Sequence, residues 1–343
     1  MAAGQIPSQD GEAWLSSLDA EDSPRTNWSD GDSALGSDMA SDWASISESI
    51  LQYRHENGRR YHAYKDGKYV LPNDDLEQDR LDLQHHVFLL TFDNQLYLCP
   101  AGRGEGHTLH NVLDIGTGTG IWANDLADEF PNAAIVGVDL SPIQSPFVPP
   151  NVRFEVMDVE EPWNFGGVQF DFIYSRMMTA ALADWPGFFQ QAYDHLAPGG
   201  WLELCDIVAL KCDDGTMKED SAMKRWVDML LEGARSMGRP FDGAYKYQEQ
   251  LKAQGFVNVQ ERVFRWPQNQ WPRNRKSKEI GMFTLENVGS GVEAISTAVY
   301  TRALGWSKER LDALIGEVRA EMRDTRIHAY WPIYVTYGQK PSG

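Results

Sequence analysis

Between residues 111 and 207, short runs of consecutive apolar residues are separated by segments that carry apolar residues at helical spacing. Runs without polar alternation are typical of strands buried on both faces, as in parallel sheets. Because helices connect these strands, the pattern predicts an α/β fold with a doubly wound sheet. The predicted strands cover residues 111–114, 134–139, 152–157, 170–174 and 201–207, and the predicted helices cover 119–130 and 185–196.

Helical patterns dominate on both sides of this block. Before it, Asp74 has Glu77 three residues later, a pair typical of a helix N-terminus with a reciprocal cap, and the helix is expected to run to about residue 92. After it, apolar runs at 256–259 and 330–337 predict two more strands, which extend the sheet beyond the fifth strand to seven. The remaining predicted helices cover residues 217–237, 244–254, 278–304 and 307–326.

The strongest local motif lies where the first predicted strand ends. Residues 112–120 read VLDIGTGTG, so the strand leads through three glycines into a helix. Glycines allow positive φ angles and let a ligand approach the backbone closely. A dinucleotide-binding turn needs the spacing G-x-G-x-x-G, whereas position 121 holds Ile121, so the motif departs from that of NAD-dependent enzymes.

Two acidic residues follow at the ends of the next two strands. Asp139 closes the second predicted strand, and Asp158 follows the third. A carboxylate in the first position can accept hydrogen bonds from both hydroxyl groups of an adenosine ribose, and one in the second can accept from the adenine amino group. Each residue alone could simply cap a helix or start a turn. Together with the glycines, at the carboxyl ends of consecutive strands, they favour an adenosine-binding site.

Over about residues 109–207 the chain resembles the class I S-adenosylmethionine-dependent methyltransferases. The glycine motif, Asp139, Asp158, the predicted 170–174 strand and the turn LAPGGW match that family in order and spacing. Over most of 51–340 the chain is similar to a narrower family, the fungal LaeA-like methyltransferases. The segments that carry this second resemblance are ENGRRYH (56–62), YVLPND (69–74), EQDRLD (77–82), VDLSPIQ (138–144) and IHAY (327–330).

The resemblance implies S-adenosylmethionine as the cofactor and a seven-stranded Rossmann-like sheet with an N-terminal helical lid. It also implies that Asp114 orients the glycine turn or the ligand's amino group, and that Asp139 holds the ribose. Arg176 is expected to face the reacting centre, although a surface ion pair would also explain an arginine there. The residues to which the resemblance gives cofactor-binding roles are Asp114, Gly116, Gly118, Gly120, Asp139, Leu140, Asp158, Val159, Ser175 and Arg176.

His62 is the expected catalytic residue. It lies in a Tyr-rich segment at 58–72, where the resembled family has its lid, and it could serve as a general base. Such a base is needed only if the acceptor is protonated at the working pH. The alternative is that His62 packs or forms hydrogen bonds as a structural residue. The histidines and cysteines show no ligand spacing, so no metal site is expected.

The net charge of the chain argues against anionic partners. The 343 residues include 50 acidic and 31 basic side chains, a formal net charge of −19, which argues against nucleic acid or an anionic membrane surface as partner. No apolar run is long enough to span a membrane, and the N-terminal residues do not form a signal-like pattern. A cytoplasmic location is therefore expected, with a nuclear location as the alternative.

The N-terminal residues differ from the rest in composition. Residues 1–50 contain ten acidic side chains and one basic side chain, and eleven serines, a composition typical of disorder. We therefore expect an acidic arm over 1–50, a lid and helix over 51–110, and a methyltransferase domain over 111–343. Acceptor-binding insertions are expected after the fifth strand, where many aromatic residues lie.

Two functions fit these features. The first is methylation of a small-molecule acceptor, a fungal secondary metabolite, with oxygen as the expected methylated atom. The second is a LaeA-like regulatory methyltransferase that acts with velvet-type protein partners in the control of secondary metabolism. A homodimer also stays open, as does recruitment of the fold to another reaction such as a cyclisation.

Overall fold

The computed structural model describes residues 53–62, 64–65, 67–104 and 108–343, so the predicted acidic arm at 1–50 lies outside the described residues. The strands are β1 (Arg54–Glu56), β2 (Arg59–Tyr61), β3 (Asn111–Ile115), β4 (Ala134–Asp139), β5 (Val152–Val156), β6 (Phe170–Arg176), β7 (Leu196–Ile207), β8 (Val257–Pro267) and β9 (Tyr330–Gln339). The helices are α2 (Asp75–Thr91), α3 (Ile121–Glu129), α4 (Trp185–His195), α5 (Ala222–Ser236), α6 (Tyr247–Gln254), α7 (Arg275–Ala298) and α8 (Lys308–Arg323), with the 3-10 helix η1 (Ala244–Lys246) and the π-helix η2 (Val299–Ala303).

Seven strands form one sheet in the order β5-β4-β3-β6-β7-β9-β8, which confirms the predicted doubly wound, seven-stranded α/β class. Neighbours from β5 to β7 pair in parallel, whereas β9 runs antiparallel to both β7 and β8. The chain order turns around between β3 and β6. Open sheets of this kind leave a ligand-binding crevice at the carboxyl ends of the strands at that point.

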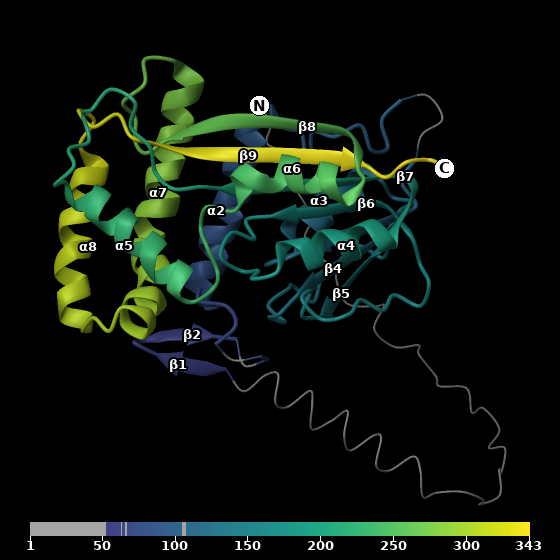
Figure 1. Ribbon diagram of the computed structural model, residues 1–343, viewed down its shortest axis with the longest axis horizontal. Coiled ribbons are helices and arrows are strands. Elements are labelled where there is room, and N and C mark those ends of the chain that lie inside the picture. Colours follow the sequence, from purple (N-terminus) through teal and green to yellow (C-terminus); the bar gives the residue numbers. More distant parts are fainter. Residues whose placement is uncertain (1–52, 63, 66, 105–107) are drawn as a thin grey trace, which may run out of the picture. The chain divides into compact units, whose positions relative to one another are not determined.

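Apolar side chains on the two faces of the sheet form two separate cores. Successive residues of β3 alternate between them, with Val112 in one core and Leu113 in the other. Helices α2, α3, α5, α7 and α8 contribute to the first core, and α4 and α6 to the second. Figure 1 shows α5, α7 and α8 gathered beside one end of the sheet.

The segment expected to form a helical lid contains a hairpin, a loop and then a helix. β1 pairs with β2, and an ion pair between Glu56 and Arg302 ties this hairpin to η2. Asp74 caps α2 as predicted, because its side chain accepts a hydrogen bond from the backbone N–H of Glu77. The reciprocal cap is wrong, since the Glu77 carboxylate pairs instead with Arg80 at 2.7 Å.

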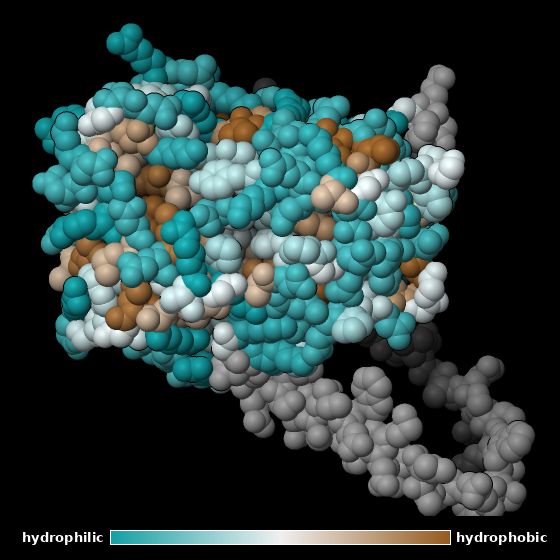
Figure 2. Space-filling view, in the orientation of Figure 1, coloured by the Kyte–Doolittle hydropathy of each residue, from teal (hydrophilic) through white to brown (hydrophobic). Residues whose placement is uncertain are grey.

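The face of the molecule in Figure 2 is largely hydrophilic, and its exposed hydrophobic side chains lie in separated groups. Across the described residues, no helix has the length and apolar character needed to cross a membrane. Two pockets in the described part of the chain form the site described next.

Candidate functional site

A pocket opens at the carboxyl ends of β3, β4, β5 and β6, where the strand order turns around. Helix α2 and the loop before it complete the wall. The space between the atoms, including the open mouth, is about 1030 Å³. Of the ten residues predicted to bind the cofactor, seven line this pocket, namely Gly116, Gly118, Asp139, Leu140, Asp158, Val159 and Arg176.

The turn after β3 requires glycine for two different reasons. Gly116, Gly118 and Gly120 have φ angles of +71°, +57° and +83°, which L side chains rarely adopt. A Cβ atom on Gly116 would lie 2.4 Å from Sδ of Met178, and one on Gly120 would lie 2.4 Å from Cζ of Phe154. Gly120 does not line the pocket, so it serves as a packing residue at the start of α3, whereas Gly116 and Gly118 leave the pocket wall free of side chains.

Two carboxylates hold this turn in place. Asp139, at the end of β4, accepts hydrogen bonds from the backbone N–H groups of Gly118 and Ser141, both at 2.9 Å. Asp114, in β3, is buried and accepts a hydrogen bond of 2.6 Å from the Thr117 hydroxyl. Burial raises the pKa of Asp114 to about 6 and also raises the pKa of Asp139. Asp114 contacts the turn without lining the pocket, whereas Asp139 does both.

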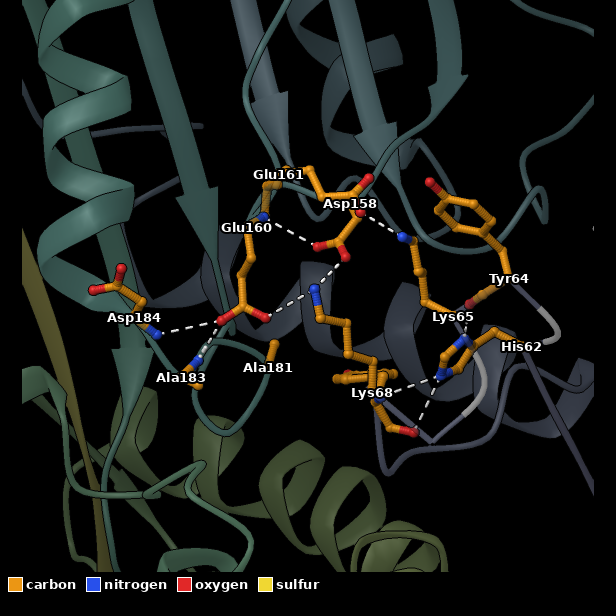
Figure 3. A network of polar contacts seen from close by, with 12 residues as sticks. His62, Tyr64, Lys65, Lys68, Asp158, Glu160, Glu161, Ala181, Ala183 and Asp184 are labelled. Atoms are coloured by element: carbon orange, nitrogen blue, oxygen red, sulfur yellow. Dashed lines mark hydrogen bonds and ion pairs between the residues drawn. The ribbon is translucent and has the colours of Figure 1, made fainter.

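Asp158 pairs with a lysine that the sequence analysis did not consider. Its carboxylate is only 3% exposed and forms an ion pair with Lys68, from the loop before α2. The same ammonium lies 3.2 Å from Glu160 (Figure 3). Although burial acts in the opposite direction, hydrogen bonds from the Ala183 N–H and from Arg239 lower the pKa of Glu160 to about 2. This network joins the loop before α2 to the loops that follow β5 and β6.

The structure places His62 within the loop and not on the pocket wall. The ring is 1% exposed, its Nδ1 lies 2.6 Å from the carbonyl oxygen of Tyr64, and its Nε2 lies 3.1 Å from the backbone N of Tyr69 (Figure 3). Nε2 also lies 3.2 Å from the carbonyl oxygen of Tyr69. Because a carbonyl only accepts, Nδ1 donates to Tyr64, whereas Nε2 faces both a donor and an acceptor of Tyr69. Backbone groups therefore occupy both ring nitrogens, and His62 holds together the loop that carries Lys68 and Tyr69.

The last two residues of β6 have different surroundings. Ser175 is fully buried and does not line the pocket, and its hydroxyl has no hydrogen-bond partner among the residues that the structure describes. Arg176 lines the pocket, with Nη2 3.2 Å from Nδ1 of His85 and its guanidinium 4.8 Å from the ring centre of Phe88. Because arginine only donates, His85 accepts at Nδ1 and donates from Nε2 to Asp125 at 2.9 Å.

Among the residues that the structure describes, Arg176 forms no surface ion pair. Burial lowers the pKa of His85, which keeps the imidazole neutral beside the guanidinium. Within the described ranges Arg176 forms no hydrogen bond or close ion pair with a carboxylate, although its charge acts on buried Asp114, so its guanidinium can still pair with an anionic group in the pocket.

The sequence predicted a lid at 58–72, but not which residues of this loop and of α2 line the pocket. Lys68 and Tyr69 from the loop, and Glu77, Leu81 and Gln84 from the helix, also line the pocket. The three helical residues follow the spacing i, i+4 and i+7, which places them on one face of a helix. That spacing is the signal that could have found them, whereas no local signal singles out Lys68 and Tyr69 within the predicted lid.

A second pocket adjoins the first and encloses about 790 Å³ of space between atoms, its mouth included. Tyr69, Leu81, Gln84 and Met177 line both pockets. The other walls of the second pocket come mainly from α2, α5, α7 and the end of β7. Most of the side chains there are apolar, in contrast to the carboxylates of the first pocket.

The groups in the first pocket suit a nucleoside that carries a charged tail. Asp139 offers carboxylate oxygens to sugar hydroxyls, the glycine turn leaves room against the backbone, and Arg176 offers a cation to an anionic group. In the described part of the chain, no cluster of three or more His, Cys, Asp or Glu side chains could hold a metal ion.

Known proteins resemble this chain over most of its length. Residues 83–261 match the family described as "Methyltransferase domain". The chain is 41% identical over 307 residues to Methyltransferase pytC of Aspergillus terreus, covering 89% of this chain and 93% of that protein. It is 37% identical over 290 residues to Secondary metabolism regulator LAE1 of Cochliobolus heterostrophus, covering 83% and 94%. It is 32% identical over 293 residues to Protein-methionine methyltransferase laeA of Emericella nidulans, covering 84% and 77%.

Proposed function

Because the chain belongs to the class I S-adenosylmethionine-dependent methyltransferases, and among them to the fungal LaeA-like family, we propose that the first pocket binds S-adenosylmethionine for methylation of a small fungal secondary metabolite on oxygen. We call this pocket the donor pocket. The observation that carries the proposal is the glycine turn held by Asp139 at the turning point of the strand order. S-adenosylmethionine supplies a methyl group that its sulfonium centre already activates. The protein's task is therefore to align the reactants and exclude water.

Each part of the donor pocket has a task in this proposal. Asp139 accepts from the ribose hydroxyls with the lone pairs that its two backbone donors leave free. Leu140 and Val159 flank the adenine, and Asp158 faces its edge while sharing a carboxylate oxygen with Lys68. Arg176 pairs with the carboxylate of the methionine portion, since it is a pocket cation that forms no hydrogen bond or close ion pair with a carboxylate in the described ranges.

The remaining predicted residues act from outside the pocket wall. Asp114 holds the glycine turn through Thr117, and Gly120 packs against Phe154. His62 has both ring nitrogens on backbone groups, so we assign it the positioning of the loop before α2 and no role as a base. Ser175 lies buried at the end of β6, next to Arg176.

Calorimetric titration with S-adenosylmethionine and S-adenosylhomocysteine tests the donor site. Asp139→Ala removes a carboxylate that accepts from two hydroxyls, a loss of roughly 1.5–3 kcal/mol, or about 10- to 150-fold in affinity. Glu155→Ala is the matched control, because Glu155 lies on neighbouring β5 with an exposed side chain that pairs with Arg153. Equal binding by both variants would contradict the assignment of Asp139 to the donor site. Binding of NAD in the same assay would indicate a dinucleotide site in its place.

The 37% identity to a protein named as a secondary metabolism regulator favours a second candidate function, a regulatory methyltransferase that acts with velvet-type partners. The two candidates differ in what the purified chain does alone. Transfer of a labelled methyl group to metabolites from a fungal extract, without any added protein, supports an enzyme that methylates small molecules. Transfer that appears only with an added velvet-type protein supports the regulator.

A further inference from the structure

We propose that the second pocket is the acceptor site and that it takes an uncharged, largely apolar small molecule whose hydroxyl group points toward the donor pocket. We call it the acceptor pocket. The inference rests on the proposed function and adds to it the chemical class of the acceptor.

The first step is the position of this pocket. In-line methyl transfer requires the acceptor atom to lie directly beside the methyl group of the donor. Tyr69, Leu81, Gln84 and Met177 line both pockets, so a molecule in the acceptor pocket borders the donor pocket directly.

The second step is the apolar wall. Trp226, Val227 and Leu230 of α5, Val288 of α7 and Trp331 of β9 line the acceptor pocket, and all are nearly fully buried. The two indole N–H groups are already used, since Trp226 donates to Ser296 at 2.7 Å and Trp331 to Gln268 at 2.6 Å. These side chains therefore present carbon atoms to the cavity, as expected for a site that buries an apolar ligand.

The third step is the absence of free charge in this part of the described structure. Arg80 lines the acceptor pocket, but its guanidinium pairs with Glu77 at 2.7 Å and donates to Asn287 at 3.2 Å. Asn287 in turn donates to the backbone oxygen of Arg80 at 2.7 Å, and each of the three guanidinium nitrogens has a partner in Glu77 or Asn287. A carboxylate or an ammonium group on the acceptor would be buried without a partner, at a large cost in free energy.

The fourth step is the polar end. Of the four residues shared by both pockets, Tyr69 and Gln84 carry polar groups, and the Tyr69 hydroxyl and the Gln84 carbonyl have no hydrogen-bond partner within the described residues. Burial raises the pKa of Tyr69, which keeps the phenol protonated as a donor. The Gln84 amide N–H group lies 3.4 Å from Asn287, which leaves its carbonyl oxygen free to accept. One donor and one acceptor side by side match the two hydrogen-bonding capacities of a single hydroxyl group.

The test uses the full chain loaded with S-adenosylhomocysteine and three two-ring probes of one shape. We expect 2-naphthol to bind, and 2-naphthoate and 2-naphthylmethylamine to bind at least about tenfold more weakly, because only the first is uncharged. Val227→Trp fills the acceptor pocket and should abolish 2-naphthol binding. Val263→Trp, on β8 where the side chain is 50% exposed, is the matched control and should not.

A milder variant covers the case in which Val227→Trp does not fold. Tyr69→Phe removes one hydroxyl and should weaken 2-naphthol about three- to tenfold while leaving naphthalene binding unchanged. Titration of S-adenosylhomocysteine alone comes first for every protein. If the wild-type chain does not bind it, the proposed function fails. If it binds, three results would overturn the acceptor inference alone. These are tighter binding of a charged probe than of 2-naphthol, no binding of 2-naphthol, or displacement of 2-naphthol by a methionine-containing peptide at a concentration below that of 2-naphthol.

Discussion

Gly118 and Gly166 share a backbone conformation but not a location. Their φ angles are +57° and +62°, and only Gly118 lies in the donor pocket. Each Gly→Ala substitution should lower the free energy of unfolding by a similar amount, about 1–2 kcal/mol, because an alanine is strained at positive φ. Only Gly118→Ala should weaken S-adenosylhomocysteine binding, since its methyl group projects into the pocket. Urea denaturation and calorimetry on both variants check this, and equal loss of binding in the two would contradict it.

His62 offers a second prediction for a single residue. Removal of a general base lowers turnover roughly 10²- to 10⁴-fold, and the pH dependence of kcat then no longer shows the pKa of that base. We expect His62→Ala to lower turnover less than about tenfold, to lower the melting temperature, and to leave the shape of the pH profile unchanged, because the ring serves the loop between Tyr64 and Tyr69. If the pH profile of His62→Ala lacks one ionisation that the wild-type profile shows, His62 acts as a general base.

At the level of elements, two lysines in contrasting surroundings join the loop before α2 to the loop that follows β5. Lys68 pairs with buried Asp158, whereas Lys65 pairs with Glu161 at the surface. Lys68→Ala leaves a buried carboxylate without its cation, so amide hydrogen exchange across 62–71 should become markedly faster. Lys65→Ala should change exchange little, because exposed ion pairs contribute little to stability. Similar exchange in both variants would show that the Asp158 pair does not hold the loop.

The sequence predicts elements better than it predicts contacts between them. The predicted strand 134–139 coincides with β4, because a continuous apolar run is a local signal. The hairpin of β1 and β2 was missed, since its strands of three residues show no clear period. The insertion of β9 between β7 and β8 depends on pairing between segments far apart in sequence, for which the sequence carries no local signal.

In the candidate site, too, the sequence predicts local motifs better than contacts between distant segments. The glycine turn and Asp139 were predictable because fixed spacings place them at the ends of neighbouring strands. The pair of Lys68 and Asp158 spans 90 residues of sequence, and no periodicity connects the two positions. His62 was assigned from its position in a lid-like segment, and its two backbone partners became visible only in the folded loop.

For the molecule as a whole, buried carboxylates make stability depend on pH, and three of them have the largest shifts in pKa. Burial raises the pKa of Asp114 and Asp206 to about 6 and that of Glu203 to about 7. Each folded-state pKa lies above the usual value, so the folded protein binds more protons than the unfolded chain between about pH 4 and 7. The free energy of unfolding should therefore fall as pH rises through this window, by up to about 1.4 kcal/mol per pH unit for each group.

Urea denaturation at pH 5.5 and 7.5 measures this dependence, with the larger free energy of unfolding expected at pH 5.5. Glu203→Gln keeps an oxygen that can accept from the N–H groups of Leu98 and Cys99 but removes the ionisation, so it should flatten the dependence. Because the lowered pKa of His85 acts in the opposite direction, the comparison with Glu203→Gln decides: the same pH dependence in both proteins would contradict the assignment.

The position of β9 also sets an order of events during synthesis on the ribosome. β9 is translated after β7 and β8, yet it lies between them, so the edge of β7 stays unpaired until residues 330–339 emerge. Every residue that lines the donor pocket lies between positions 68 and 182, whereas the lining of the acceptor pocket extends to Trp331. A nascent chain thus carries every lining residue of the proposed donor pocket about 150 residues before the last lining residue of the proposed acceptor pocket is added.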